Sequence, residues 1–111
     1  MKTFTTEVHL GGRIRKPANQ VLLLRSDVNY THIHMRNGDH YVVATTLKKL
    51  EERLEGLGFW RFNKSEMVNI SAAKILKNEG MVKVRNHDPM KISRRKRQKM
   101  ESILFSQGEL A

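Results

Sequence analysis

The sequence YTHIHMRNGDHYVVA, residues 30–44, carries the strongest structural signal in this chain. Thr31, Ile33 and Met35 alternate with more polar side chains, which is the pattern of a strand with one buried face. Asn37-Gly38 is a favoured two-residue hairpin turn, and residues 40–44 read as the returning strand. The stretch therefore predicts an antiparallel hairpin.

Further strands are predicted on both sides of this hairpin. Short apolar or alternating runs, bounded by turn residues, occupy residues 3–10, 21–24, 59–62, 67–70, 74–77, 81–85 and 90–93. Two helices interrupt them. The first is amphipathic, with Thr45 or Thr46 as its cap, Gly56 and Gly58 after its end, and an apolar stripe of Leu47, Leu50, Leu54 and Leu57.

The second helix is expected after Ser93, with Met100, Ile103 and Leu104 on one face and a frayed tail over residues 106–111. The predicted fold class is mainly β, made of short antiparallel sheets with one central and one C-terminal short helix. With 111 residues, the chain is expected to form a single domain over residues 1–111.

The charge of the chain points to a polyanionic partner. Twenty-one Lys and Arg stand against eleven Asp and Glu, giving a formal net charge of +10. Without cysteines, neither disulfides, thiolate zinc sites nor a cysteine nucleophile is possible. No apolar run is long enough to insert into a membrane, and no signal peptide is recognisable, so we expect a cytoplasmic protein.

The basic charge is densest in residues 91–99, KISRRKRQK, which hold six cations and no carboxylate. Ser93 is suited to cap a helix that begins there. Cations in the first turn of a helix are unfavourable with its dipole, and an external anion such as phosphate would offset this cost. The alternative is a solvated surface that only adds solubility.

Other site chemistries have little support. His32, His34 and His40 could approach one another across the hairpin, but no carboxylate or fourth ligand has fitting spacing, and polar positions on a solvated sheet face are the favoured explanation. No catalytic triad order or phosphate-binding glycine loop occurs. We therefore expect no enzyme activity, no cofactor and no bound metal.

The familiar nucleic-acid modules are also missing. The chain has no zinc-finger spacing, no heptads and no RNA-recognition-motif signature, and its strand-rich centre leaves no room for a helix-turn-helix. Charge alone leaves two alternatives to duplex-DNA binding. One is a general RNA-binding or ribosome-associated basic domain, and the other is an interaction module for an acidic partner or anionic lipid.

A series of short motifs nevertheless follows in a recognisable order. In chain order these are RSDVNYT (25–31), NG (37–38), TLKKL (46–50), GFWRFNKS (58–65), MVNI (67–70) and ISRR (92–95). Together they resemble the LytTR DNA-binding domain of bacterial transcriptional regulators, over about residues 17–105. The resemblance implies an elongated arrangement of short sheets that reads successive major grooves through loops rather than through a recognition helix.

The same resemblance implies the site residues. It places base contacts at Asn29, Asn63, Lys64 and Arg94. The chemistry agrees, since Arg94 can fork onto guanine, Asn29 and Asn63 onto adenine, and Lys64 onto a guanine acceptor or a phosphate. Phosphate contacts are expected from Arg95, Arg97, Lys99 and Ser65. Asn63-Lys64 departs from the commoner His-Arg or His-Lys of the family, which affects base preference. As alternatives, Asn29 could be a left-handed turn residue, and Lys64 and Arg94 plain surface cations.

The resemblance also implies how the protein works with partners. The expected partner is double-stranded DNA carrying direct repeats, with a homodimer on DNA and a regulatory protein as further possibilities. Only about twenty residues precede the match, too few for a receiver domain, and Met1 favours a complete stand-alone regulator. Asn69 is expected to tie a turn to the backbone, and Trp60 and Phe62 to fill the core.

Overall fold

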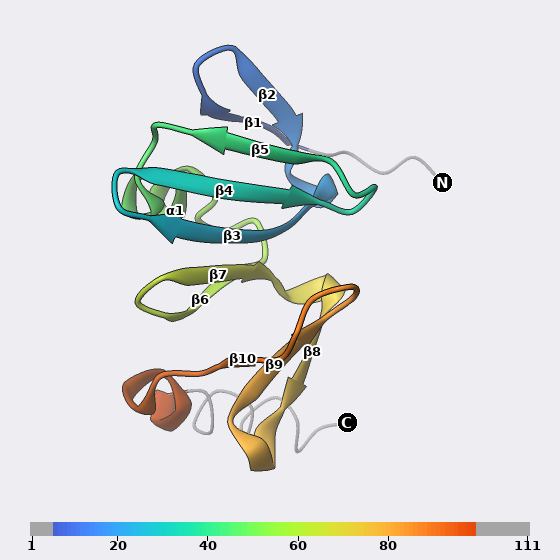
Figure 1. Cartoon of the computed structure of the whole chain (residues 1–111), viewed down its shortest axis with the longest axis vertical. Helices are drawn as coiled ribbons and strands as arrows, with labels where there is room; N and C mark the ends of the chain where they lie inside the picture. Colours follow the sequence, from blue (N-terminus) through green and yellow to red (C-terminus); the bar gives the residue numbers. More distant parts are fainter. Residues whose placement is uncertain (1–5, 100–111) are drawn as a thin grey trace.

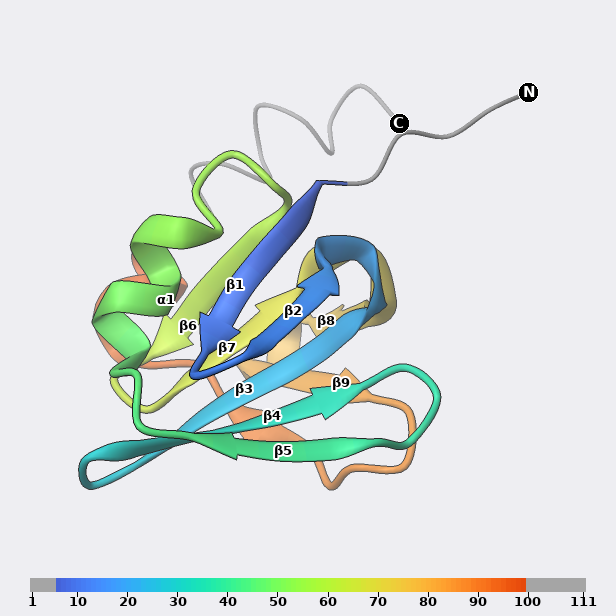
Figure 2. The same cartoon turned by 90° about the horizontal axis from the view of Figure 1, so that it is seen from above.

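The computed structural model describes residues 6–99, and the fold there is mainly β, as predicted. Ten strands in this part of the chain form three antiparallel sheets, which follow one another from top to bottom of Figure 1. Figure 2 shows the same arrangement from above, with helix α1 at one side of the sheets. Residues 3–5, Met100, Ile103, Leu104 and the predicted tail lie outside the described residues.

The first sheet is a hairpin of β1 (Glu7–Gly11) and β2 (Ile14–Pro17). The sequence predicts a strand over residues 3–10, which overlaps β1, whereas β2 is not among the predicted strands. Gly12 has φ +55°, a left-handed conformation that glycine adopts without steric cost, and it forms the turn of this hairpin with Arg13. A short 3-10 helix, Ala18–Gln20, leads from it into the next sheet.

The central sheet has the strand order β5-β4-β3-β7-β6. Its strands are β3 (Val21–Asp27), β4 (Tyr30–Met35), β5 (His40–Val43), β6 (Phe59–Asn63) and β7 (Glu66–Asn69). The predicted hairpin is β4–β5, with Ile33 opposite Tyr41. Thr31, Ile33 and Met35 are buried, which confirms the face predicted from the alternation.

Helix α1 (Leu47–Arg53) covers one side of this sheet and is shorter than its apolar stripe suggests. The side chain of Thr46 accepts from the Lys49 amide at 3.2 Å and caps the helix, as predicted. Leu54 closes the helix in a turn that Gly56 and Gly58 continue at positive φ, so the last leucine of the stripe, Leu57, lies beyond its end.

The third sheet has the order β10-β9-β8, formed by β8 (Ala73–Leu76), β9 (Met81–Val84) and β10 (Met90–Lys91). Short 3-10 helices, Ile70–Ala72 and Lys77–Glu79, flank β8. After β10 the chain turns at Ser93 into the predicted second helix, which is described over residues 94–99.

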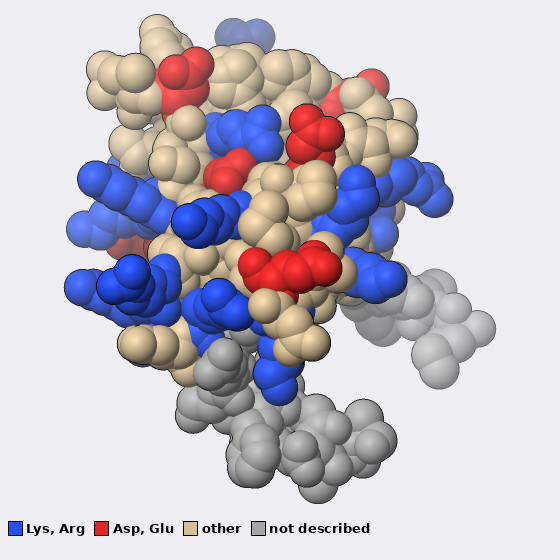
Figure 3. All heavy atoms as spheres, turned by 60° about the horizontal axis from the view of Figure 1, so that its bottom comes forward, with Lys and Arg blue, Asp and Glu red and all other residues tan. Residues whose placement is uncertain are grey.

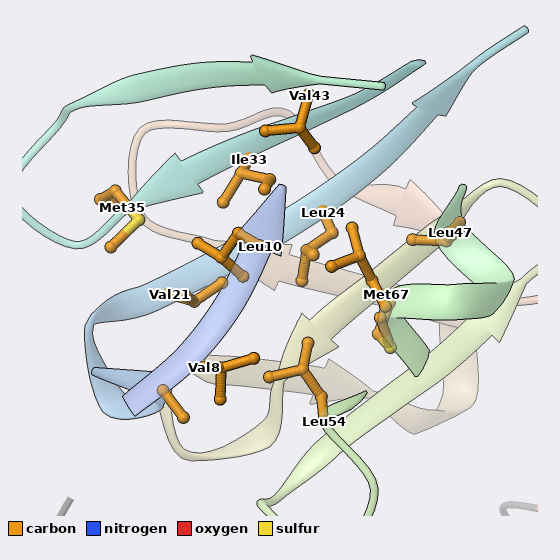
Figure 4. Close-up of a cluster of buried hydrophobic side chains, with 12 residues drawn as sticks. Val8, Leu10, Val21, Leu24, Ile33, Met35, Val43, Leu47, Leu54 and Met67 are labelled. Carbon is orange, nitrogen blue, oxygen red and sulfur yellow. The ribbon is translucent and has the colours of Figure 1, made fainter. Parts of the chain in front are cut away.

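Two buried clusters hold the sheets together. The first joins β1, the inner face of the central sheet and α1 (Figure 4), with Leu10, Leu24 and Leu50 completely buried. The second joins the other face of the central sheet to the third sheet, with Phe62 and Val82 completely buried and Trp60 packed against them. The prediction that Phe62 belongs to the core is confirmed, and Trp60 packs at the edge of the same cluster, partly buried.

Candidate nucleic-acid interface

Three turns that are far apart in the sequence lie at one edge of the molecule. They are the β3–β4 turn, the β6–β7 turn and the start of the C-terminal helix, all on the left in Figures 1 and 2. We call the surface formed by residues 28–29, 64–65 and 93–97 the loop edge. It brings together Asn29, Lys64 and Arg94, three of the four predicted base-contacting residues.

The β3–β4 turn has a two-residue loop. Asp27 pairs with Tyr30 across the hairpin, which leaves Val28 and Asn29 at the tip, both exposed. Beside this hairpin, the Ser26 amide donates to the Ser65 carbonyl at 2.8 Å. Strand β3 continues past that contact to Asp27 and the tip. In Figure 1 the tip reaches farther to the left than the neighbouring β6–β7 turn.

The β6–β7 turn is also a two-residue loop, because Asn63 pairs with Glu66 around Lys64 and Ser65. Asn63 organises it. Its Nδ2 donates to Glu66 Oε1 and to the Lys91 carbonyl, both at 2.8 Å, and its Oδ1 accepts from the Ser65 amide at 2.8 Å. Both amide hydrogens are thus engaged within the protein, whereas Lys64 is left exposed at the tip.

The third element begins at Ser93, which joins the basic helix to the central sheet. The Ser93 amide donates to the Phe62 carbonyl at 2.9 Å, and its Oγ accepts from the Lys96 amide at 3.2 Å. Ser93 is thus the predicted helix cap. The Arg97 guanidinium turns back to donate to the Asn78 carbonyl at 3.0 Å, while Arg94 and Arg95 are exposed.

The residues that hold the turns in place were not among those predicted from the sequence. Arg61 donates to the Lys64 carbonyl at 2.6 Å and pairs with Glu51 of α1 at 3.1 Å, so it joins the β6–β7 turn to the helix. Arg25 of β3 pairs with Glu66 at 2.8 Å. For Arg61 the sequence contains one indication. This residue stands between large apolar residues in FWRF, residues 59–62, and this pattern indicates an ion-paired position inside a strand.

The loop edge is hollowed and cationic. A depression of about 560 Å³ is lined by residues that include Asn63, Ser93 and Arg94, and a second, of about 470 Å³, by residues that include Lys64 and Arg95. Figure 3 shows Lys and Arg gathered on this left side of the molecule, with further cations on the right. Lys99 is exposed one turn along the helix from Arg95.

Side-chain hydrogen bonds divide the predicted site residues into two groups. Within residues 6–99, no side-chain hydrogen bond or ion pair engages Asn29, Lys64 or Arg94. Asn63, in contrast, binds the main-chain carbonyl of Lys91 in β10, and Arg97 binds that of Asn78 in the 3-10 helix between β8 and β9. The first group can reorient toward a ligand, and the second fixes the geometry of the edge.

The histidines form a cluster on the outer face of β4 and β5. The His32 and His40 rings lie 2.8 Å apart at Nδ1 and Nε2, and His34 stacks on His40 with ring centroids 4.6 Å apart. His87, from the turn before β10, meets His34 edge-on at 4.7 Å. Burial, together with His87 and His40, lowers the pKa of His34 to about 4. No group of three or more His, Cys, Asp or Glu among the described residues is arranged to hold a metal ion.

Asn69 has the structural role that the sequence predicts. It is buried, its Nδ2 donates to the Val21 carbonyl at 3.0 Å, and its Oδ1 accepts from the Ser71 amide at 3.1 Å. The side chain thereby joins the start of β3 to the turn after β7.

Comparison with known proteins assigns the family. The family model described as the LytTr DNA-binding domain matches residues 12–105, starting five residues before the match predicted from the motifs. The chain belongs to the LytTR DNA-binding domain family. It is thus a DNA-binding domain of the kind found in transcription regulators, and this family assignment points away from an enzyme.

A solved structure has the same LytTR fold. It is the LytTr DNA-binding domain of a protein described as a methyl-accepting/DNA response regulator from Bacillus cereus. The two share 17% identity with a TM-score of 0.69, over 93% of this chain and 98% of that one. A search of curated proteins found no match. None of the helices in the described part of this LytTR chain is long and apolar enough to cross a membrane.

Proposed function

We propose that this LytTR domain is a sequence-specific duplex-DNA-binding regulator of the bacterial cytoplasm that reads major grooves with the loop edge. The observation that carries the proposal is that three exposed turns converge on one cationic edge. Two of these turns have loops of only two residues. Such narrow tips fit a groove about 12 Å wide. The longest dimension of the protein, 41 Å, is comparable with one turn of B-DNA, about 34 Å.

Residue chemistry supports a division of roles along this edge. We assign base contacts to Arg94, which can fork onto a guanine edge, to Asn29 on adenine, and to Lys64 on a guanine acceptor. Arg95, Lys99, Ser65 and Arg97 are assigned to phosphates, which position the protein without specifying sequence. Asn63 has two proposed roles. Its amide nitrogen positions the β6–β7 turn through its two hydrogen bonds. Its Oδ1 has one lone pair left, and a base contact through this lone pair stays a prediction.

Occupation of direct repeats by two copies follows from the family resemblance and forms part of the proposal. Two domains on adjacent sites would need no dimer in free solution, because the DNA itself sets their spacing. Control by a regulatory protein partner is a further part of the proposal.

Selection of bound duplexes from a random DNA pool tests the proposal. We expect an enriched half-site, its repeat in the same orientation, and an affinity that falls steeply with salt, with a log–log slope of about −0.9 per neutralised phosphate. Equal affinity for the selected duplex and a scrambled one at physiological salt would refute sequence-specific binding. Ready displacement of the duplex by RNA would favour the RNA-binding alternative instead.

A further inference from the structure

The β3–β4 turn contains an apolar residue whose position is unfavourable in two ways. The side chain of Val28 is 92% exposed, the highest value among the large hydrophobic residues of the described chain. Its φ is +57°, in the left-handed region, which is a genuine outlier for a β-branched residue. Two-residue hairpin loops need positive φ at their first position, where Gly, Asn or Asp are the usual residues.

Within residues 6–99, no buried contact favours valine at this position. Val28 belongs to neither buried cluster, and its neighbour Asn29 would suit a left-handed backbone better. Sparsely populated backbone conformations concentrate at ligand-binding sites, where function offsets the strain. The same tip projects farthest at the loop edge, beyond the Ser26–Ser65 contact.

We propose that Val28 is a specificity-determining residue that reads the 5-methyl group of a thymine in the major groove. This inference rests on the proposed function. The thymine methyl is the apolar feature of the major-groove base edges, and small apolar side chains recognise it by direct contact. Val28 has two methyl groups on a stiff side chain. Because it shares the hairpin tip with Asn29, it would reach the same part of the groove as the bases that Asn29 contacts.

Replacement of single thymines by deoxyuridine tests the contact at the level of one methyl group. In the selected duplex, each thymine is replaced in turn, and affinity is measured by fluorescence anisotropy for the intact chain. Loss of one buried methyl should weaken binding about fourfold at one position of each half-site. Other positions of the duplex should respond less.

A variant then links that position to Val28. Val28→Gly should bind the thymine duplex about as weakly as the unaltered protein binds the uracil duplex, and should no longer distinguish the two. Its melting temperature should be unchanged or raised, because glycine adopts the positive φ without strain. A merely structural role for Val28 would give the reverse, a lower melting temperature with the uracil effect intact.

Ile70→Ala is the matched control, since Ile70 is exposed and apolar but lies in the 3-10 helix on the opposite edge. This variant should keep both the affinity and the uracil effect. Specific duplex binding that ignores every uracil replacement, or a uracil effect that persists in Val28→Gly, would overturn the role of Val28 and leave the proposed function standing. Absence of any specific duplex binding would overturn both.

Discussion

The side-chain nitrogen of Asn63 lies 2.8 Å from the main-chain oxygen of Lys91, so the β6–β7 turn is joined directly to the strand that leads into the basic helix. Because Glu66 also receives a hydrogen bond from Asn63 and an ion pair from Arg25, the contact is part of a chain of interactions that runs from β3 to β10. Two of the three turns of the loop edge are therefore held in one geometry by a single amide.

Replacing Asn63 should consequently affect stability and binding together. Asn63→Ala leaves Glu66 and the Lys91 carbonyl without this partner, and the free energy of unfolding should fall by about 1–3 kcal/mol in urea titrations. Affinity for the selected duplex should fall as well, for every sequence through the disturbed turn and most at the one base pair that Asn63 Oδ1 is proposed to contact. Asn78→Ala is the control, because within residues 6–99 Asn78 is engaged through its main-chain carbonyl, which accepts from Arg97. A uniform loss with the base preference unchanged would limit Asn63 to positioning the turn.

Arg94 and Arg85 separate specific recognition from the general effect of charge. Arg94→Ala should weaken binding to the selected duplex by about 1–3 kcal/mol and relax the preference at one base pair. Arg85 is also exposed, but it lies beside Arg36, which comes directly after the last residue of β4. Asn29 comes directly before the first residue of β4, at the other end of the strand. Arg85→Ala removes the same charge and should change affinity much less. Anisotropy titrations on the selected duplex and its single-base variants measure both, and equal losses for the two variants would contradict the assignment.

The parts of this fold that depend on neighbouring residues could be predicted from the sequence. The alternation in β4 and the Thr46 and Ser93 caps act within a few residues, and the structure has each of them. A turn does lie at Asn37-Gly38, but it is a three-residue loop over residues 36–38 and not the predicted two-residue turn, since the Met35 amide donates to the Asp39 carbonyl at 2.8 Å. The β1–β2 hairpin was missed because Gly11-Gly12 marks a turn and an interruption equally well, and because the strand after it is polar and ends in proline.

Long-range features of the candidate site could not be read from the residues alone. The pairing of β3 with β7 places Arg25 opposite Glu66, 41 positions away, and no local pattern indicates it. For the β3–β4 turn, the sequence suggests Asn29 as the left-handed residue, whereas the register makes it Val28. The family motifs made it possible to assign the three turns to one site, which local patterns do not show. These motifs follow one another in the same order as the turns that strand pairing brings together.

Close packing between the first two sheets gives a further prediction. A methyl group on Gly11 would lie 2.7 Å from Val43 Cβ and 2.6 Å from Thr45 Oγ1, so β1 must move away from β5 to accept it. Gly11→Ala should therefore lower the free energy of unfolding by about 1–3 kcal/mol, as overpacking does. Gly12→Asn is the control, because no atom outside the turn lies within 4 Å and asparagine tolerates the left-handed backbone. Urea midpoints that fall equally in the two variants would contradict the packing argument.

The histidine cluster predicts a loss of stability on acidification. Burial, followed by the neighbouring His87 and His40, lowers the pKa of His34 from 6.5 to about 4 in the folded protein, and burial and Arg25 lower that of His87. Between pH 6.5 and 4 the unfolded chain therefore binds more protons than the folded one, so the free energy of unfolding falls as the pH falls through this range. Above pH 7 both states are neutral at these rings and the effect is absent.

Comparison of variants isolates this contribution from that of the carboxylates. His34→Gln removes the titrating ring from the centre of the cluster, where Arg25, His32, His40 and His87 surround it, with Asp27 beside His32 and Asp88 beside His87. Its urea midpoint should fall less between pH 7 and pH 5 than that of the unaltered protein. His9→Gln, in the separate β1–β2 sheet, should retain the full dependence. Parallel pH curves for the unaltered protein and His34→Gln would show that protonation of this cluster does not oppose folding.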